Sequence, residues 1–197
     1  MPRAVFLDRD GVINRKAPEG RYVTSWAEVR FLPGVAQAVK RLHEAGFLVL
    51  VVSNQRAIAK GLVTEHGLES LHRRMWRELF QGEQGFDGVY YCPHDADPPC
   101  GCRKPQPGML LTAAQDRGID LTASWMVGDS ESDVEAGCRA GCRTIRIGLP
   151  EVRFSTSAEE VAGSLREAAN ILLAMESATA PIPTCHSPGE MKSSARH

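Results

Sequence analysis

The feature of this sequence that most restricts its fold is a regular alternation between short apolar runs and longer amphipathic stretches. The apolar runs predict strands at 4–7, 48–52, 89–91, 125–127 and 144–147. The helical spacing of apolar residues predicts helices over 35–45, 64–80, 107–117, 131–140 and 158–175. Strands that alternate with helices form βαβ units, in which the strands run parallel.

We therefore expect an α/β fold with a Rossmann-like, mostly parallel sheet flanked by helices. The 197 residues suffice for one sizeable hydrophobic core. We expect a single domain over residues 1–176, followed by a disordered tail over 177–197, which is rich in Pro, Ser, Thr and Ala. The segments 14–25 and 53–89 leave room for no more than a minimal cap over the strand ends.

The charge of the chain limits its partners. The formal net charge is -1, so no basic excess indicates binding to nucleic acid or to an anionic membrane. The longest apolar run, at 47–52, is much shorter than the roughly 18 residues of a membrane span. The first residues show no signal-peptide pattern. We expect a cytoplasmic monomer with a small-molecule substrate.

Two carboxylates, Asp8 and Asp10, follow the first predicted strand. Residues two apart along a strand point to the same side, so both side chains can face one pocket. Carboxylates at such a distance repel each other unless a cation lies between them or one is protonated. Mg²⁺ prefers oxygen ligands of this kind. Taken alone, the segment could also be an exposed acidic turn that ends in Asp-Gly.

Other polar groups occur where later strands end. Ser53 and Asn54 follow the second strand, Lys104 lies in a loop, Asp129 follows the fourth strand, and Asp133 comes one helical turn later. The carboxyl ends of parallel strands meet at one edge of a sheet, where ligands bind. Hydroxyl, N–H and ammonium groups at that edge could hold phosphate oxygens. Singly, each is also compatible with a turn, a helix cap or a solvated side chain.

A second metal site is indicated by Cys92, His94, Cys100 and Cys102. Three thiols and one imidazole can form a tetrahedron around Zn²⁺, and such a closed set is typical of a structural site. The alternative is a loop with three free thiols. Because Arg103 and Lys104 follow directly, a zinc-bound loop would fix the position of two cations.

The chain resembles the haloacid dehalogenase superfamily of phosphohydrolases over residues 4–148. The motifs that carry the resemblance are Leu7-Asp8-Arg9-Asp10-Gly11, Val52-Ser53-Asn54, Lys104-Pro105 and Gly128-Asp129 with Asp133. The resemblance implies that Asp8 is a nucleophile that forms an aspartyl phosphate and that Asp10 is the general acid and base. It implies Mg²⁺ on Asp8, on the backbone carbonyl of Asp10 and on Asp129. It also implies that Ser53 and Lys104 hold the phosphoryl group, and that Asp133 orients Lys104 or the metal shell. Asn54, in the same motif as Ser53, is expected to bind substrate.

The cysteine loop before Arg103-Lys104-Pro105 resembles the branch of this superfamily that acts on heptose bisphosphates and on histidinol phosphate. The segment 53–61 resembles the heptose enzymes, although Ala57 replaces a Gly and Lys60 replaces an Arg. The resemblance implies a magnesium-dependent phosphatase that removes the 7-phosphate of a heptose 1,7-bisphosphate. The second phosphate needs its own cation, for which Arg103 is the first candidate and Arg56 and Lys60 are others.

Three alternatives remain open from the sequence. A histidinol-phosphate phosphatase would use the same machinery on another substrate. A receiver-type signalling domain also combines acids, a hydroxyl and a lysine, but its phospho-accepting Asp comes from a middle strand and it has no late Gly-Asp such as Gly128-Asp129. A zinc-binding interaction module would use the cysteine loop alone, which is a small part of this chain.

Overall fold

The computed structural model describes residues 1–179. Its centre is a six-stranded sheet in the order β3-β2-β1-β4-β5-β6, in which every neighbouring pair is parallel. The strands are β1 (Arg3–Leu7), β2 (Phe47–Asn54), β3 (Gly88–Cys92), β4 (Trp125–Gly128), β5 (Arg143–Ile147) and β6 (Glu160–Ala162). The predicted α/β fold with a parallel sheet is therefore confirmed.

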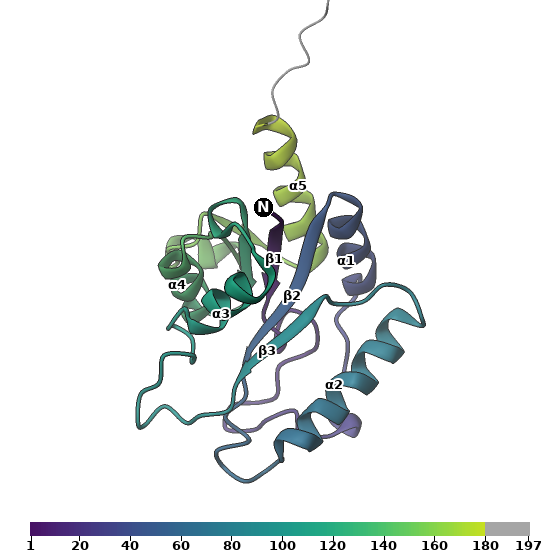
Figure 1. Cartoon of the computed structure of the whole chain (residues 1–197), viewed down its shortest axis with the longest axis vertical. Helices are drawn as coiled ribbons and strands as arrows, with labels where there is room; N and C mark the ends of the chain where they lie inside the picture. Colours follow the sequence, from purple (N-terminus) through teal and green to yellow (C-terminus); the bar gives the residue numbers. More distant parts are fainter. Residues whose placement is uncertain (180–197) are drawn as a thin grey trace, which may run out of the picture.

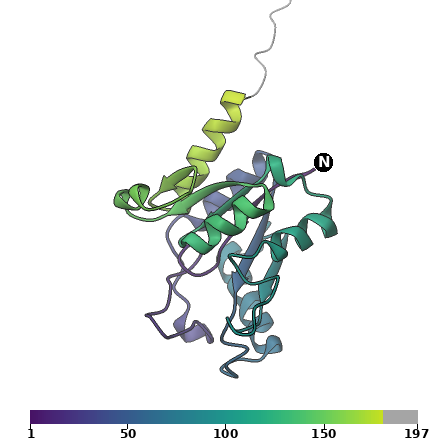
Figure 2. The same cartoon turned by 90° about the vertical axis from the view of Figure 1, so that its left-hand side faces the viewer.

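Helices cover both faces of the sheet (Figures 1 and 2). They are α1 (Val35–Glu44), α2 (Glu65–Phe80), α3 (Gly108–Arg117), α4 (Glu131–Ala140) and α5 (Leu165–Thr179). Three short 3-10 helices are at Trp26–Glu28, Leu121–Ala123 and Pro150–Phe154. In Figure 1, α3 and α4 lie on one side of the sheet and α1 and α2 on the other. Among the described residues, no helix combines the length and apolar character that crossing a membrane requires.

The alternation of side chains along β1 explains the two layers. Val5 and Leu7 belong to one core cluster, together with residues of α1 and α5, whereas Ala4 and Phe6 belong to a second cluster with residues of α3 and α4. Successive residues of a strand point to opposite faces, so a strand that is buried on both sides must be apolar throughout. Residues 4–7 are all fully buried, which fixes β1 in the middle of the sheet.

Helix α2 packs beside the strand-end edge and supports a loop there. Leu71 and Met75 of α2 form a small cluster with Val23 and Val29, which lie in the segment between β1 and α1. The helix begins where Thr64 accepts a hydrogen bond from the backbone N–H of Gly67 at 3.0 Å. The segment that follows the acid pair is thus held against α2.

The prediction of one helix over 158–175 is wrong at its start. Residues Glu160–Ala162 form β6 instead, an edge strand paired with β5, and α5 begins only at Leu165. Between them, the Ser164 hydroxyl accepts from the backbone N–H of Glu167 at 3.3 Å and caps the new helix, and the Gly163 N–H donates to the Glu167 carboxylate at 2.9 Å. The helix continues to Thr179, three residues beyond the expected end of the domain at 176. The rest of the predicted tail lies outside the described residues.

Candidate active site

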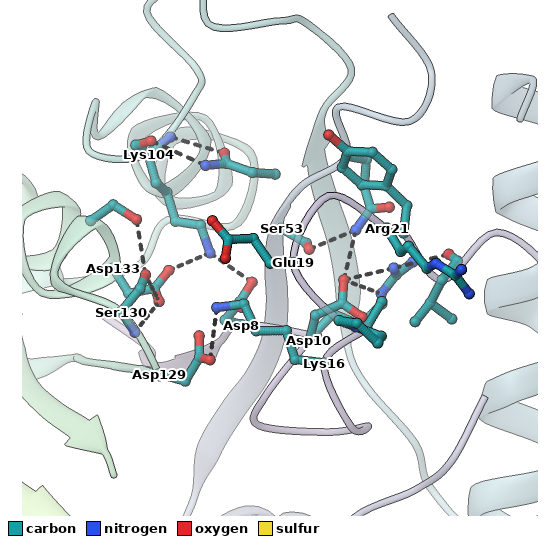
Figure 3. Close-up of a pocket in the computed structure, with 18 of the residues that line it drawn as sticks. Asp8, Asp10, Lys16, Glu19, Arg21, Ser53, Lys104, Asp129, Ser130 and Asp133 are labelled. Carbon is teal, nitrogen blue, oxygen red and sulfur yellow. Dashed lines mark hydrogen bonds and ion pairs between the residues drawn. The ribbon is translucent and has the colours of Figure 1, made fainter. Parts of the chain in front are cut away.

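The carboxyl ends of β1, β2 and β4, with the loop after β3, form a cavity of about 380 Å³ (Figure 3). The predicted residues Asp8, Asp10, Ser53, Lys104 and Asp129 all line it. The cavity is also lined by Arg9, Lys16–Val23, Asn54, Gln55, Arg103, Ser130, Ser132 and Asp133. Four sequence segments that are far apart in the chain therefore meet at the edge of the sheet where a parallel fold binds ligands.

Lys104 is the centre of the hydrogen-bond network on the floor of this cavity. Its ammonium donates to Asp8 Oδ1 at 2.8 Å and to the backbone carbonyl of Val52 at 2.8 Å, and it pairs with Asp133 Oδ1 at 2.6 Å (Figure 3). All three donor positions of the ammonium are therefore used. Burial alone would lower the pKa of Lys104, but the charges of Asp133 and Asp8 raise it above its usual value, so the side chain stays cationic.

Asp133 is oriented by the start of α4. Its Oδ2 accepts from the Ser130 hydroxyl at 2.6 Å and from the Ser130 backbone N–H at 3.0 Å, which forms a capping box. Its other oxygen is thereby directed at Lys104. Gly128 is required beside it, because a Cβ there would lie 2.1 Å from the Asp133 Cβ. Asp133 therefore contacts the Lys104 ammonium, and its role in orienting Lys104 or the metal shell stays a prediction.

Asp8 is a buried carboxylate with opposing electrostatic influences. Burial, together with the nearby charges of Asp133 and Asp10, raises the pKa of Asp8 to about 7, although the charge of Lys104 acts in the opposite direction. A carboxylate in this position is costly to ionise unless cations balance its charge. Lys104 supplies one such cation, and a divalent metal would supply another.

A second carboxylate group faces Asp8 across the cavity. Ligand oxygens of Asp8, Asp129 and Asp133 lie within 4.8 Å of one another. Burial raises the pKa of Asp129, and Lys16 opposes this through a 2.9 Å ion pair (Figure 3). Gly11, with a φ of 97°, allows the close approach, because a Cβ at this position would lie 2.3 Å from Asp129 Oδ2. Oxygen donors of this number and spacing fit Mg²⁺.

Asp10 is held from both of its carboxylate oxygens. Its Oδ2 accepts from the Arg9 guanidinium at 2.7 and 3.2 Å, and its Oδ1 accepts from the Asn14 amide at 2.8 Å. The Gln55 amide lies 3.5 Å from Oδ2 and donates to the Ser53 hydroxyl at 2.8 Å. The Asp10 side chain remains 22% exposed, so it can still reach a ligand in the cavity.

Asn54 interacts mainly with the lysine loop. Its amide nitrogen donates to the Lys104 carbonyl at 3.0 Å, and its amide oxygen accepts from the Lys104 backbone N–H at 3.0 Å. The two bonds fix the backbone from which the Lys104 side chain extends. Asn54 was expected to bind substrate, and any such contact of its side chain would use the second N–H of the amide nitrogen or the second lone pair of the amide oxygen.

Arg103 and Arg56 differ in how they relate to the cavity. Arg103 lines it and donates to the His94 carbonyl at 3.3 Å, so its position depends on the cysteine loop. Arg56 was also expected to bind substrate, but its guanidinium pairs with Asp95 of the same loop at 2.5 Å. The Lys60 ammonium lies 5.6 Å from the centre of the Tyr22 ring. Binding of substrate by Arg56 would require the Asp95 pair to break.

The four predicted zinc ligands converge. His94 Nδ1 lies 3.5 Å from Cys92 Sγ and 3.3 Å from Cys102 Sγ, and Cys100 Sγ lies 3.5 Å from each of the other two sulfurs. Burial raises the pKa of Cys92 to about 12. The pKa of Cys100 falls to about 6, because hydrogen bonds from the Arg103 backbone N–H and from the Cys102 and Cys92 thiols together outweigh the effect of burial. Three thiols and one imidazole at these distances fit a tetrahedral Zn²⁺ site.

Several residues of the site were not predicted from the sequence. Arg9, Asn14 and Gln55 hold Asp10, and Lys16 pairs with Asp129. The position of the first three is their only sequence signal: Arg9 lies within the first motif, Gln55 directly follows the second, and Asn14 lies three residues after the first. Glu19, Arg21 and Tyr22 reach the cavity from a loop whose path depends on its packing against α2.

Comparisons with known proteins assign the chain to a family. A family model described as HAD-hydrolase-like matches residues 101–149. The D-glycero-beta-D-manno-heptose-1,7-bisphosphate 7-phosphatase of Rhodopseudomonas palustris is 41% identical over 158 residues, which cover 77% of this chain and 82% of that protein. The chain belongs to this family of phosphatases. The enzyme of the same name from Escherichia coli K12 is 41% identical over 157 residues, 75% of this chain and 81% of that protein.

A solved structure of this phosphatase family has the same fold. It is the D,D-heptose 1.7-bisphosphate phosphatase from B. bronchiseptica in complex with magnesium and phosphate. The TM-score is 0.79 and the identity 34%, over 88% of this chain and 99% of that one. The predicted membership of the haloacid dehalogenase superfamily is therefore confirmed, and the chain is a phosphatase of that superfamily.

Proposed function

We propose that the chain removes the 7-phosphate of D-glycero-D-manno-heptose 1,7-bisphosphate through an aspartyl-phosphate intermediate. The observation that carries the proposal is the position of Asp8 between the Lys104 ammonium and the Asp129 carboxylate, in the cavity that Asp10 also lines. The substrate follows from the names of the relatives, which describe heptose bisphosphate phosphatases.

In the first step, a carboxylate oxygen of Asp8 bonds to phosphorus while the bond between phosphorus and the sugar oxygen breaks. The proton of Asp10 passes to the departing oxygen, which leaves as an alcohol. Lys104 lies 2.8 Å from Asp8 Oδ1 and favours the ionised, nucleophilic form of that carboxylate. The Ser53 hydroxyl lines the same cavity and is placed to contact the equatorial phosphoryl oxygens.

In the second step, a water molecule attacks the phosphorus of the aspartyl phosphate. Asp10, now ionised, takes a proton from this water, and the bond between phosphorus and Asp8 breaks. The products are inorganic phosphate and the restored Asp8 carboxylate. Asp10 therefore serves once as an acid and once as a base, and it needs a fixed orientation in both steps.

Mg²⁺ fits the oxygen donors at the strand ends. Asp8, Asp129 and the backbone carbonyl of Asp10 would hold it, and Asp133 would act on Lys104 rather than on the metal. When bound, the metal offsets the negative charge of the phosphoryl group and of the carboxylates. Support comes from the three converging acids and from the magnesium in the B. bronchiseptica structure.

We assign the 1-phosphate to Arg103. A guanidinium can bind phosphate with two hydrogen bonds, and Arg103 lines the cavity next to Lys104. A structural Zn²⁺ on Cys92, His94, Cys100 and Cys102 would hold this residue in place. Free thiols of this kind need a reducing compartment, which supports a cytoplasmic enzyme.

A comparison of substrates tests the proposal. Values of kcat/KM would be measured for the two anomers of the heptose bisphosphate and for histidinol phosphate, with Mg²⁺ present. We expect at least one anomer to exceed histidinol phosphate clearly. A higher value for histidinol phosphate than for both sugars would overturn the substrate and favour the alternative enzyme on the same machinery.

A further inference from the structure

Behind Asp10 lies a buried pair of side chains, Arg9 and His72, that the proposed chemistry does not use. Arg9 is 1% exposed and His72 is 4% exposed. Arg9 comes from the loop after β1 and His72 from the middle of α2. A buried guanidinium is stable only when its charge is paired and its N–H groups are bonded. The groups that Arg9 contacts therefore indicate its structural role.

The contacts of Arg9 go to Asp10, to His72 and to one carbonyl group. Nε and Nη2 donate to Asp10 Oδ2 at 3.2 and 2.7 Å, and Nη2 also lies 3.3 Å from the carbonyl of Val23. Nη1 lies 3.1 Å from His72 Nε2. The edge of the guanidinium that meets the carboxylate is thus set by what holds the opposite nitrogen.

His72 can hold that nitrogen only as a neutral acceptor. Arg9 has donors and no acceptor, so His72 Nε2 must carry a lone pair and the imidazole proton must lie on Nδ1. Burial lowers the pKa of His72 to about 3, and the charge of Arg9 contributes, so the ring is neutral in the working range of pH. Stacking on Trp76, with ring centres 5.3 Å apart, fixes the plane of the ring.

We propose that His72 is a positioning residue for Asp10, which it orients through Arg9. The acceptor on α2 keeps the guanidinium turned so that two of its N–H groups meet Asp10 Oδ2, while Asn14 holds Oδ1. The inference rests on the proposed function, because it assumes that Asp10 transfers the proton to the leaving oxygen.

If His72 positions Asp10, the loss of rate in a His72 variant should depend on the leaving group of the substrate. A sugar oxygen must receive a proton from Asp10 as its bond to phosphorus breaks, whereas p-nitrophenolate leaves without one. Misplacement of Asp10 should therefore slow the first step with the sugar substrate and affect p-nitrophenyl phosphate much less. General distortion of the site would slow both reactions alike.

The test uses single-turnover rapid quench with enzyme in excess, so that release of the leaving group reports the first step alone. His72→Phe keeps an aromatic ring on Trp76 and removes the acceptor. His72→Gln restores an acceptor oxygen near the position of Nε2. His66→Phe is the matched control, because His66 is exposed on the same helix. If His72→Phe does not fold, His72→Met replaces it, since methionine adapts to irregular space.

We expect His72→Phe to slow release of the sugar about 10-fold or more, a part of the 10²–10⁴ that a general acid contributes. Release of p-nitrophenol should fall about 3-fold or less, the enzyme concentration that gives half the maximal single-turnover rate should change little, and His72→Gln should recover most of the rate. In a protein that already carries Arg9→Met, His72→Phe should not widen the difference between the sugar and p-nitrophenol rates any further. Without the guanidinium, His72 can no longer influence the orientation of Asp10.

An equal loss with both leaving groups would overturn the inference. The inference would also be overturned if His72→Phe slowed release of the sugar as much in the Arg9→Met background as in the wild-type protein. It would likewise be overturned if His72→Gln failed to restore the rate. Failure of the proposed function would look different, because the wild-type protein itself would then release neither sugar nor phosphate.

Discussion

Four charged residues, Asp8, Asp10, Lys104 and Asp129, could be found from the sequence. The three acids follow strands whose apolar pattern is clear, whereas Lys104 lies in a loop and was found through the Lys104-Pro105 motif. Their roles depend on residues that the sequence does not mark. Arg9 stands between two predicted acids, yet the burial of its side chain follows from the packing of α2 against the loop after β1. Local spacing contains no information on such a contact, because the partners are 63 positions apart.

Asp10 gives the most direct prediction at this scale. Asp10→Asn preserves the shape of the side chain, but the amide can neither give nor take a proton at the reacting oxygens and keeps only one of the two acceptor oxygens. We expect kcat to fall by at least about 100-fold, in the range of general acid–base contributions. Steady-state phosphate release measures this effect. Asp116→Asn, at an exposed position of α3, is the control and should retain wild-type rates; an Asp10→Asn variant as active as this control would refute the assigned role.

His72 also makes stability depend on pH. The pKa is about 3 in the folded chain and near 6.5 when the residue is unperturbed, so between these values the unfolded chain binds the additional proton. The free energy of unfolding must then fall as the pH falls through this range. Near about pH 5, His72→Gln should reduce the slope against pH by about 1.4 kcal/mol per pH unit. Urea denaturation at several pH values measures it, and an unchanged slope would contradict the buried neutral ring.

At the scale of elements, the strands and helices that carry the site lie within one or two residues of their predicted positions. The exception is β6, which was predicted as part of a helix. Residues 158–162 satisfy a helical spacing of apolar residues, and the choice of strand comes from the open edge of β5, with which Val161 and Ala162 pair. A three-residue edge strand has no periodic pattern of its own, so only the tertiary context reveals it.

The cysteine loop links an element to function. Cys102→Ala removes one of four ligands, and we expect zinc to be lost and Arg103 to lose its fixed position. Because Arg103 binds the distal phosphate in our proposal, KM for the bisphosphate should rise about 10-fold, with a smaller change in kcat. Metal analysis and steady-state kinetics test both parts. Cys138→Ala, an exposed thiol on α4, is the control; zinc loss with unchanged kinetics would refute the coupling.

In the whole molecule, one end of the sheet carries the active site and the other end anchors the C-terminal helix. The carboxyl ends of the strands carry the site, whereas α5 is attached at the opposite end. There Glu176 of α5 accepts from the buried Trp125 indole at 3.1 Å and pairs with Arg3 and Arg143. The sequence predicted the layers but not this attachment, because it joins residues that are distant along the chain.

Glu176→Ala should therefore separate stability from activity. It leaves the Trp125 N–H buried without its acceptor, which costs about 1–3 kcal/mol of unfolding free energy. Denaturant unfolding and kcat/KM would be measured on the same preparation, with Glu135→Ala as the control, since an exposed pair such as Glu135 and Arg139 contributes about 0.5 kcal/mol or less. If Glu176→Ala lost much of its kcat/KM under conditions in which all of the protein is folded, stability and activity would not be separate.

The central claim is that Asp8 is phosphorylated during turnover. Acid quench of the enzyme within milliseconds of mixing with heptose bisphosphate and Mg²⁺, followed by peptide mass spectrometry, tests it directly. The account predicts one phosphoryl group on the peptide that contains Asp8, which disappears as substrate is exhausted and is absent from Asp8→Asn, a variant without turnover. Phosphate release at the wild-type rate by Asp8→Asn, or turnover with phosphate on another residue, would contradict the account.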